Sequence, residues 1–179
     1  MPNVLLAAGA SAALHKSCDL ASKLAQKGYA VRTVLTPSAA KLVSPQLFEA
    51  LTGESAHVDE FSASRGSAMD HIELAHWADC FVVAPATADL VSRLALGLAG
   101  DLVGTVSLAL DVGTPRLIAP AMNPAMLAAR PVQRHKDQLV EDGWRWLAPG
   151  EGHMACGDHG SGRLMEPADI VERVAESLR

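Results

Sequence analysis

The sequence is poor in cysteine, in clustered basic residues and in long apolar runs. Its three cysteines form no CxxC pair, so we expect a reducing, cytoplasmic location and no disulfide framework. Fifteen basic residues, scattered along the chain, stand against twenty acidic ones. The charge pattern therefore argues against nucleic acid as a binding partner, because neutralising phosphates requires a basic face. No apolar run approaches the roughly 20 residues of a membrane helix, and the apolar N-terminus lacks the basic region of a signal peptide. We expect no membrane partner.

Aromatic residues are also scarce, at 4% against 49% apolar residues, which indicates a core of Ala, Leu and Val. Short apolar runs alternate with amphipathic stretches, as a parallel sheet wrapped by helices requires. Cys80 to Ala84 (CFVVA) is continuously apolar, which is typical of a strand buried on both faces. The predicted fold class is α/β: residues 1–179 form a single doubly wound domain, Rossmann-like or flavodoxin-like, with helices on both faces of a parallel sheet.

The boundaries follow from periodicity and from the glycines and prolines between the elements. Strands are expected at Asn3–Ala7, Ala30–Leu35, Cys80–Ala84, Arg116–Ala119 and Trp144–Leu147. Helices are expected at Ala12–Lys27, Pro45–Leu51, His71–Trp77, Leu90–Gly97, Leu102–Leu110, Gln133–Glu141 and Ala168–Leu178, with a helical turn at Thr36–Ser38. Ala56–Met69 and Pro149–Arg163 are expected to be irregular.

Three corners between a strand and a helix carry small or hydroxyl residues: Gly9–Ala13, Thr36–Ala39 and Ala84–Asp89. None contains the GxGxxG fingerprint of dinucleotide sites. Taken singly, each is explained as well by a tight turn or a helix cap. In a parallel sheet, however, such corners share one edge, where backbone amides at helix starts bind anions. Together they favour a mononucleotide site.

A fourth corner, Pro120–Met126 (PAMNPAM), adds an amide and two methionines. Asn123 is able to orient a carboxylate, and the methionines are able to pack on a flat ring, although methionine serves more often as core filling. His71 is a candidate for proton transfer near neutral pH, with a structural role as the alternative.

The spacing His153-x-x-Cys156-x-x-His159 offers three metal ligands. A closed zinc site takes four, and the glycine-rich surroundings favour a flap over residues 149–163. We therefore expect no metal, with a zinc-binding module as a minor alternative.

Four stretches in this order resemble the flavin-containing cysteine decarboxylases. They are His71–Leu74, Ala84–Asp89, Pro120–Met126, and Ala155–Gly157 with Gly160–Arg163. That family includes phosphopantothenoylcysteine decarboxylases and enzymes that decarboxylate the C-terminal cysteine of ribosomally made peptides. The resemblance covers nearly the whole chain.

The resemblance implies FMN as the cofactor and a homo-oligomer, a trimer often assembled into a dodecamer, with His71 supplied across a subunit interface. The residues implied to bind FMN are Gly9, Ala10, Ser11, Ser38, Leu42, Pro85, Ala86, Thr87, Asp89 and Met122.

The implied reaction oxidises the cysteine unit to a thioaldehyde, which then loses CO2 to give an enethiol. By resemblance, Asn123 binds the substrate carboxylate and His71 handles protons. Cys156 protonates the enethiol where the product is reduced again. Met126, Ala155 and Gly157 are implied to contact the substrate, beneath a flap that excludes water.

The substrate is left open by the sequence. Cys156 favours phosphopantothenoylcysteine of coenzyme A biosynthesis. Leu127, Gly100 and His135 depart from residues common in the pantothenate enzymes, and we expect, by a small margin, the C-terminal cysteine of a precursor peptide. A non-catalytic flavoprotein regulatory subunit is a further alternative, disfavoured by the presence of both His71 and Asn123. A flavin prenyltransferase is another, disfavoured by the Asn123 motif and the Cys156 flap.

Overall fold

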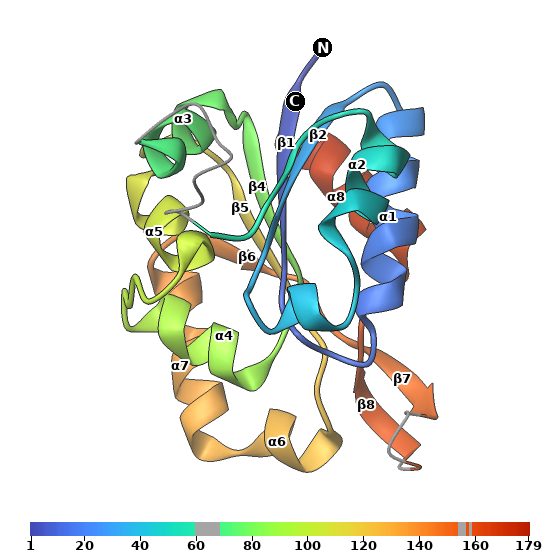
Figure 1. Ribbon diagram of the computed structural model, residues 1–179. Coiled ribbons are helices and arrows are strands. Elements are labelled where there is room, and N and C mark those ends of the chain that lie inside the picture. The colour runs from blue at the N-terminus through green and yellow to red at the C-terminus, as the bar shows by residue number, and fades with distance from the viewer. Residues whose placement is uncertain (60–68, 154–156, 158) are drawn as a thin grey trace.

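Six parallel strands form the main sheet in the part of the chain that the computed structural model describes, namely residues 1–59, 69–153, 157 and 159–179 (Figure 1). Their order is β3-β2-β1-β4-β5-β6, which is the order of a Rossmann fold, with the switch between β1 and β4. The strands are β1 (Asn3–Ala8), β2 (Ala30–Leu35), β3 (Ala56–His57), β4 (Cys80–Ala86), β5 (Arg116–Pro120) and β6 (Trp144–Trp146). The α/β doubly wound prediction is confirmed.

Helices cover both faces of this sheet (Figure 1). One face carries α1 (Leu14–Gln26), α2 (Pro45–Thr52) and α8 (Pro167–Ser177). The other face carries α3 (Asp70–Trp77), α4 (Ala88–Ala95), α5 (Leu102–Ala109) and α7 (Arg130–Glu141). The short helices η1 (Ala39–Lys41) and α6 (Pro124–Ala128) lie at the carboxyl edge of the sheet.

The core is divided in two by the sheet, and β1 contributes to both halves. Val4 and Leu6 pack under α1 and α8, whereas Leu5 and Ala7 pack under the helices of the opposite face. This alternation is the period of two of a β-strand with both faces covered. It explains why the strands read as continuous apolar runs rather than as alternating ones.

Three stretches differ from the sequence-based expectation. Residues 56–57 form the edge strand β3 instead of starting a loop, and residues 124–128 form α6, which was not expected. The stretch 149–163 is not irregular in its described part, because β7 (Gly150–His153) pairs antiparallel with β8 (His159–Arg163). A two-residue strand and a glycine-rich hairpin are too short or too poor in β-branched residues for periodicity to detect.

None of the helices in the described ranges combines the length and the apolar character that crossing a bilayer requires.

The start of α5 lies very close to the backbone that follows α4. A Cβ atom on Gly104 would lie 2.4 Å from the Leu98 carbonyl oxygen and 3.2 Å from the Ala99 Cα. The backbone cannot yield as a flexible side chain can, so the contact requires glycine. Gly104 thus allows the backbone after α4 to lie directly against the start of α5.

We expect Gly104→Ala to destabilise the protein. Overpacking costs typically about 1–3 kcal/mol, which outweighs the roughly 0.5–1 kcal/mol that Ala gains over Gly inside a helix. Thermal or urea unfolding measures the difference. Gly113→Ala is the matched control, because a Cβ there meets no atom within 4 Å. Equal stability of the two variants would contradict the packing argument.

Candidate active site

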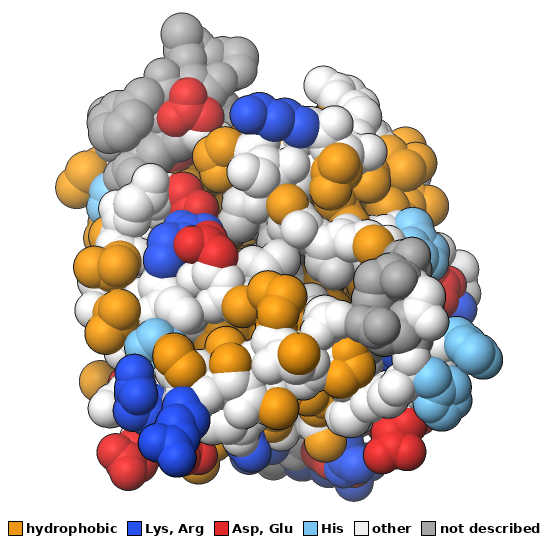
Figure 2. All heavy atoms as spheres, turned by 90° about the horizontal axis from the view of Figure 1, so that it is seen from below, with side chains coloured by type: hydrophobic (Ala, Val, Ile, Leu, Met, Phe, Trp, Pro, Cys, Tyr) orange, Lys and Arg blue, Asp and Glu red, His pale blue; other side chains and the backbone are white. Residues whose placement is uncertain are grey.

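A cavity of about 680 Å³ opens at the carboxyl edge of the sheet, where the loops after β1, β2, β4 and β5 converge. This is the end of the molecule that Figure 2 presents, where apolar side chains and white surface, which is backbone or other uncharged groups, lie near the centre and charged groups lie mostly toward the rim. Volumes of 300–1,000 Å³ are usual for small-molecule sites. The cavity is lined by Ala10, Ser11, Thr36, Pro37, Ser38, Thr87, Ala88, Asp89, Arg93, Gly100, Asp101, Ala121, Met122 and Met126.

Hydroxyl side chains organise three of these loops. Ser11 Oγ accepts a hydrogen bond from Ala13 N at 3.2 Å, and Thr36 Oγ1 accepts one from Ala39 N at 3.1 Å. Thr87 Oγ1 caps α4 by accepting from Leu90 N at 3.2 Å. The starts of α1 and α4 are thereby held at the cavity wall, where their dipoles favour an anionic group.

A charged cluster closes the α4–α5 side of the cavity. Arg93 Nε lies 2.9 Å from Asp89 Oδ2, and Arg93 Nη1 lies 2.8 Å from Asp101 Oδ2. Burial by itself would lower the pKa of Arg93, but the hydrogen bonds and charges of Asp101 and Asp89 raise it above its ordinary value. Asp101 also caps α5 through Gly104 N at 3.0 Å. The cluster therefore keeps a permanent cation in a fixed position on this wall.

A second cavity, of about 390 Å³, adjoins the first and shares Ser11, Ala121 and Met122 with it. Its further lining consists of Ala12, Ala13, His15, Lys16, Asn123, His153, Gly162, Arg163 and Leu164. The β7–β8 hairpin forms one wall and is tied to the loop after β5, because Met122 N donates to the Gly162 carbonyl oxygen at 3.0 Å.

Two cations of this second cavity share one carboxylate. Glu166 Oε1 lies 2.7 Å from Lys16 Nζ and 3.5 Å from Arg163 Nη2. The hydrogen bond from Lys16 lowers the pKa of Glu166 below its usual range. Two cations against one carboxylate leave this wall basic, in a chain whose net charge is −5.

Asn123 lines the smaller cavity directly after Met122, which both cavities share, and its amide has a defined orientation. Its Oδ1 accepts a hydrogen bond from Ala125 N at 2.8 Å and so caps α6. Because the oxygen is engaged in this way, the group that the amide offers to a carboxylate ligand is its NH2 donor. The same bond therefore both starts α6 and fixes the direction of the amide.

His71 is not brought to these cavities within one chain. It is the second residue of α3, which lies in Figure 1 at the end of the molecule opposite β7, β8 and α6. Among the described residues that line the two cavities His71 is absent.

The structure brings some of the predicted cofactor and substrate residues to the two cavities but not others. The structure places Ala10, Ser11, Ser38, Thr87, Asp89, Met122 and Met126 around the larger cavity, and Asn123 in the smaller one. Gly9, Leu42, Pro85, Ala86 and Gly157 are not among the lining residues described. Cys156 and Ala155 lie outside the described residues.

Sequence reasoning missed the charged lining. Arg93 follows Asp89 by four residues, a helical spacing typical of ion pairs, and this signal could have pointed to it. Lys16 and Glu166 are 150 residues apart, and no local pattern could have joined them. The rings of His153 and His159 lie 4.9 Å apart, but the described residues contain no group of three or more candidate metal ligands.

The whole chain, residues 1–179, matches the model of the flavoprotein family. A coenzyme A biosynthesis bifunctional protein CoaBC from Bacillus subtilis is 43% identical over 170 residues, which are 95% of this chain. The CoaBC of Escherichia coli strain K12 is 36% identical over 94% of the chain. The chain spans about two-fifths of the length of these curated relatives, 41% in both cases.

Two solved structures are similar over almost the full chain. A mutant PPC decarboxylase complexed with pantothenoylaminoethenethiol has a TM-score of 0.86 and 31% identity, covering 98% of this chain and 97% of its own. The FMN-dependent cysteine decarboxylase SpaF has a TM-score of 0.84 and 29% identity, covering 100% and 98%. The chain therefore belongs to the flavoprotein family, in the group that contains the FMN-dependent cysteine decarboxylases.

Proposed function

We propose that this chain binds FMN in the larger cavity and decarboxylates the cysteine unit of phosphopantothenoylcysteine. The observation that carries the proposal is the position of Asn123, whose oriented amide lines the smaller, basic cavity beside Met122, which both cavities share.

The residues of the larger cavity fit FMN in size and in chemistry. Its volume of about 680 Å³ lies within the range of cofactor sites. Ser11, Ser38 and Thr87, with the helix starts beside them, would hold the phosphate and the ribityl hydroxyls. Ala121 and Met122 offer an apolar surface to the flat ring.

Bound FMN would supply a two-electron oxidation at the carbon that bears the thiol, which creates the electron sink that loss of CO2 needs. The chain would do the rest. Asn123 would bind the carboxylate through its NH2 group and hold it beside the shared wall. The β7–β8 hairpin, fastened to Met122, would cover the substrate and exclude water.

His71 of one subunit would serve the cavities of another. Within a chain α3 lies far from the carboxyl edge (Figure 1), so an imidazole that handles protons there has to come from a second copy. This geometry supports the homo-oligomer that the sequence resemblance implies, a trimer often assembled into a dodecamer.

The basic wall and the curated relatives favour the pantothenate substrate. Phosphopantothenoylcysteine carries a phosphate besides its carboxylate, and Lys16 and Arg163 line the smaller cavity. The curated relatives are named for coenzyme A biosynthesis. Both considerations outweigh the sequence departures at Leu127, Gly100 and His135, which by themselves favoured a peptide substrate by a small margin. A cysteine-terminated peptide remains the second candidate on the strength of those three sequence departures.

We expect the purified protein to show flavin absorption near about 370 and 450 nm and to turn over phosphopantothenoylcysteine. Mass spectrometry of the product separates the outcomes. Loss of CO2 alone indicates a reduced product, and loss of CO2 with two hydrogens indicates an enethiol. Turnover of a cysteine-terminated peptide in place of phosphopantothenoylcysteine would establish the second candidate. A yellow protein inactive on both would point to a regulatory flavoprotein.

Asn123→Ala and His71→Ala should each abolish turnover while FMN stays bound, because neither residue lines the larger cavity. Co-expression of the two variants should restore activity, since about one site in four regains both side chains if subunits assemble at random. Decarboxylation assays on the mixed oligomer measure this. Lack of any recovery in a verified mixed oligomer would contradict the transfer of His71 between subunits.

A further inference from the structure

The smaller cavity has one end at the larger cavity and another end under the β7–β8 hairpin. Met122 is shared with the larger cavity, and Asn123 follows it. Arg163 and Leu164 are shared instead with a third hollow, of about 270 Å³. A molecule that fills the smaller cavity would therefore extend from Met122 and Asn123 toward Arg163.

The charges around this second end change sign at Arg163. The described lining of the smaller cavity contains two cations, Lys16 and Arg163, and no Asp or Glu. Three acidic residues line the third hollow besides Arg163, namely Glu151, Glu166 and Asp169. The cations favour an anionic group of a ligand within the smaller cavity, and the carboxylates disfavour it beyond. Such a group would therefore come to rest at Arg163.

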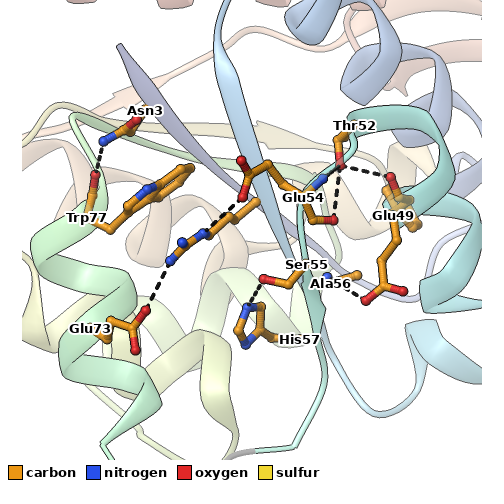
Figure 3. A network of polar contacts seen from close by, with 11 residues as sticks. Asn3, Glu49, Thr52, Glu54, Ser55, Ala56, His57, Glu73 and Trp77 are labelled. Carbon is orange, nitrogen blue, oxygen red and sulfur yellow. Dashed lines mark hydrogen bonds and ion pairs between the residues drawn. The ribbon is translucent and has the colours of Figure 1, made fainter. Parts of the chain in front are cut away.

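Two other arginines of the chain, Arg32 and Arg93, are each paired with two carboxylates. Arg32 Nε lies 3.4 Å from Glu54 Oε2, and its Nη1 lies 3.3 Å from Glu73 Oε1. The same guanidinium lies 4.6 Å from the centroid of the Trp77 ring (Figure 3). Arg93 is held by two aspartates in the larger cavity. In both clusters two negative charges stand against one positive charge.

Arg163 differs, because the carboxylate that it contacts belongs mainly to another cation. Its Nη2 lies 3.5 Å from Glu166 Oε1, whereas Lys16 Nζ lies 2.7 Å from the same oxygen. The hydrogen bond from Lys16 is also the largest cause of the lowered pKa of Glu166. The Arg163 side chain is 39% exposed, so its charge is available to a ligand.

The guanidinium of Arg163 is also held in a defined place. It lies over Gly152 of β7, where a Cβ atom would be 2.7 Å from Arg163 Nη1 and 3.2 Å from Cδ. A side chain at residue 152 would push the guanidinium aside, because the long arginine side chain yields more easily than the backbone. The glycine therefore provides the room that the guanidinium occupies. A planar guanidinium fork in a fixed place suits two oxygens of a phosphate.

We propose that Arg163 binds the phosphate of phosphopantothenoylcysteine, at the end of the smaller cavity that adjoins the third hollow, and so selects the phosphorylated substrate. The inference rests on the proposed function and adds to it the residue that determines specificity. A cysteine-terminated peptide has no phosphate to offer this site. The pantothenoyl chain separates the phosphate from the reacting carbon, so Arg163 contributes binding that is equal in the ground state and the transition state.

The test compares phosphopantothenoylcysteine with pantothenoylcysteine, which lacks only the phosphate, in the wild type, Arg163→Gln and Arg163→Lys. We expect Arg163→Gln to raise KM for the phosphorylated substrate by about ten- to a hundredfold, the range for a hydrogen bond to a charged group, at unchanged kcat. KM for pantothenoylcysteine should not change, because it has no phosphate contact to lose. Arg163→Lys should lose only part of the preference, since it keeps the charge and not the fork.

Lys27→Gln is the matched control, and we expect it to change neither KM. Lys27 forms a similarly exposed ion pair with Glu172, at 2.9 Å, and is not among the described residues that line the cavities. Equal losses on both substrates in Arg163→Gln would overturn the inference, because they would mean a general role. A wild type that decarboxylates both substrates without preference would overturn it and leave the proposed function standing. A wild type inactive on both refutes the proposed function, and the inference with it.

Discussion

The loops that follow β1 and β4 lead to opposite faces of the sheet, and a close backbone contact holds them together where they part. Gly9 N donates to the Pro85 carbonyl oxygen at 2.9 Å. A Cβ atom on Gly9 would lie 2.9 Å from that same oxygen and 3.2 Å from Leu90 Cδ2. The glycine is therefore required for backbone approach at the switch point of the sheet. Because these loops are joined here, Ser11 and Thr87 come to lie around one cavity.

The position of this cavity could be predicted from the sequence, because parallel strands bring their carboxyl ends to one edge. What could not be predicted is which residue of each corner faces the ligand. In the first corner Ala10 and Ser11 line the cavity, whereas Gly9 packs against Pro85. In the third, Thr87 lines it and Ala86 is buried in the core. Neighbouring residues at the end of a strand point in different directions, and the irregular register between β4 and β5 after Val83 hides which is which.

The smaller cavity was harder to predict, because its walls come from distant parts of the chain. Lys16 and Glu166 meet across 150 residues, and the hairpin reaches the loop after β5 through Met122 and Gly162. The sequence Gly150–His153 offers no hydrophobic alternation, since the residues of β7 are exposed or only partly buried. Each of these features depends on tertiary contacts that leave no periodic trace.

The two cavities differ in which parts of the structure hold their walls in place. The larger cavity is built from corners that the sheet itself positions, so its form follows from the strand order. The smaller cavity depends on the hairpin and on exposed ion pairs, in which Glu166 keeps 57% of its side chain exposed. Exposed pairs contribute little stability, so their residues can change without loss of the fold. A PPC decarboxylase and the FMN-dependent cysteine decarboxylase SpaF match the chain almost equally well, with TM-scores of 0.86 and 0.84: the fold is shared, and a difference in substrate between such enzymes would arise in the walls that the sheet does not fix.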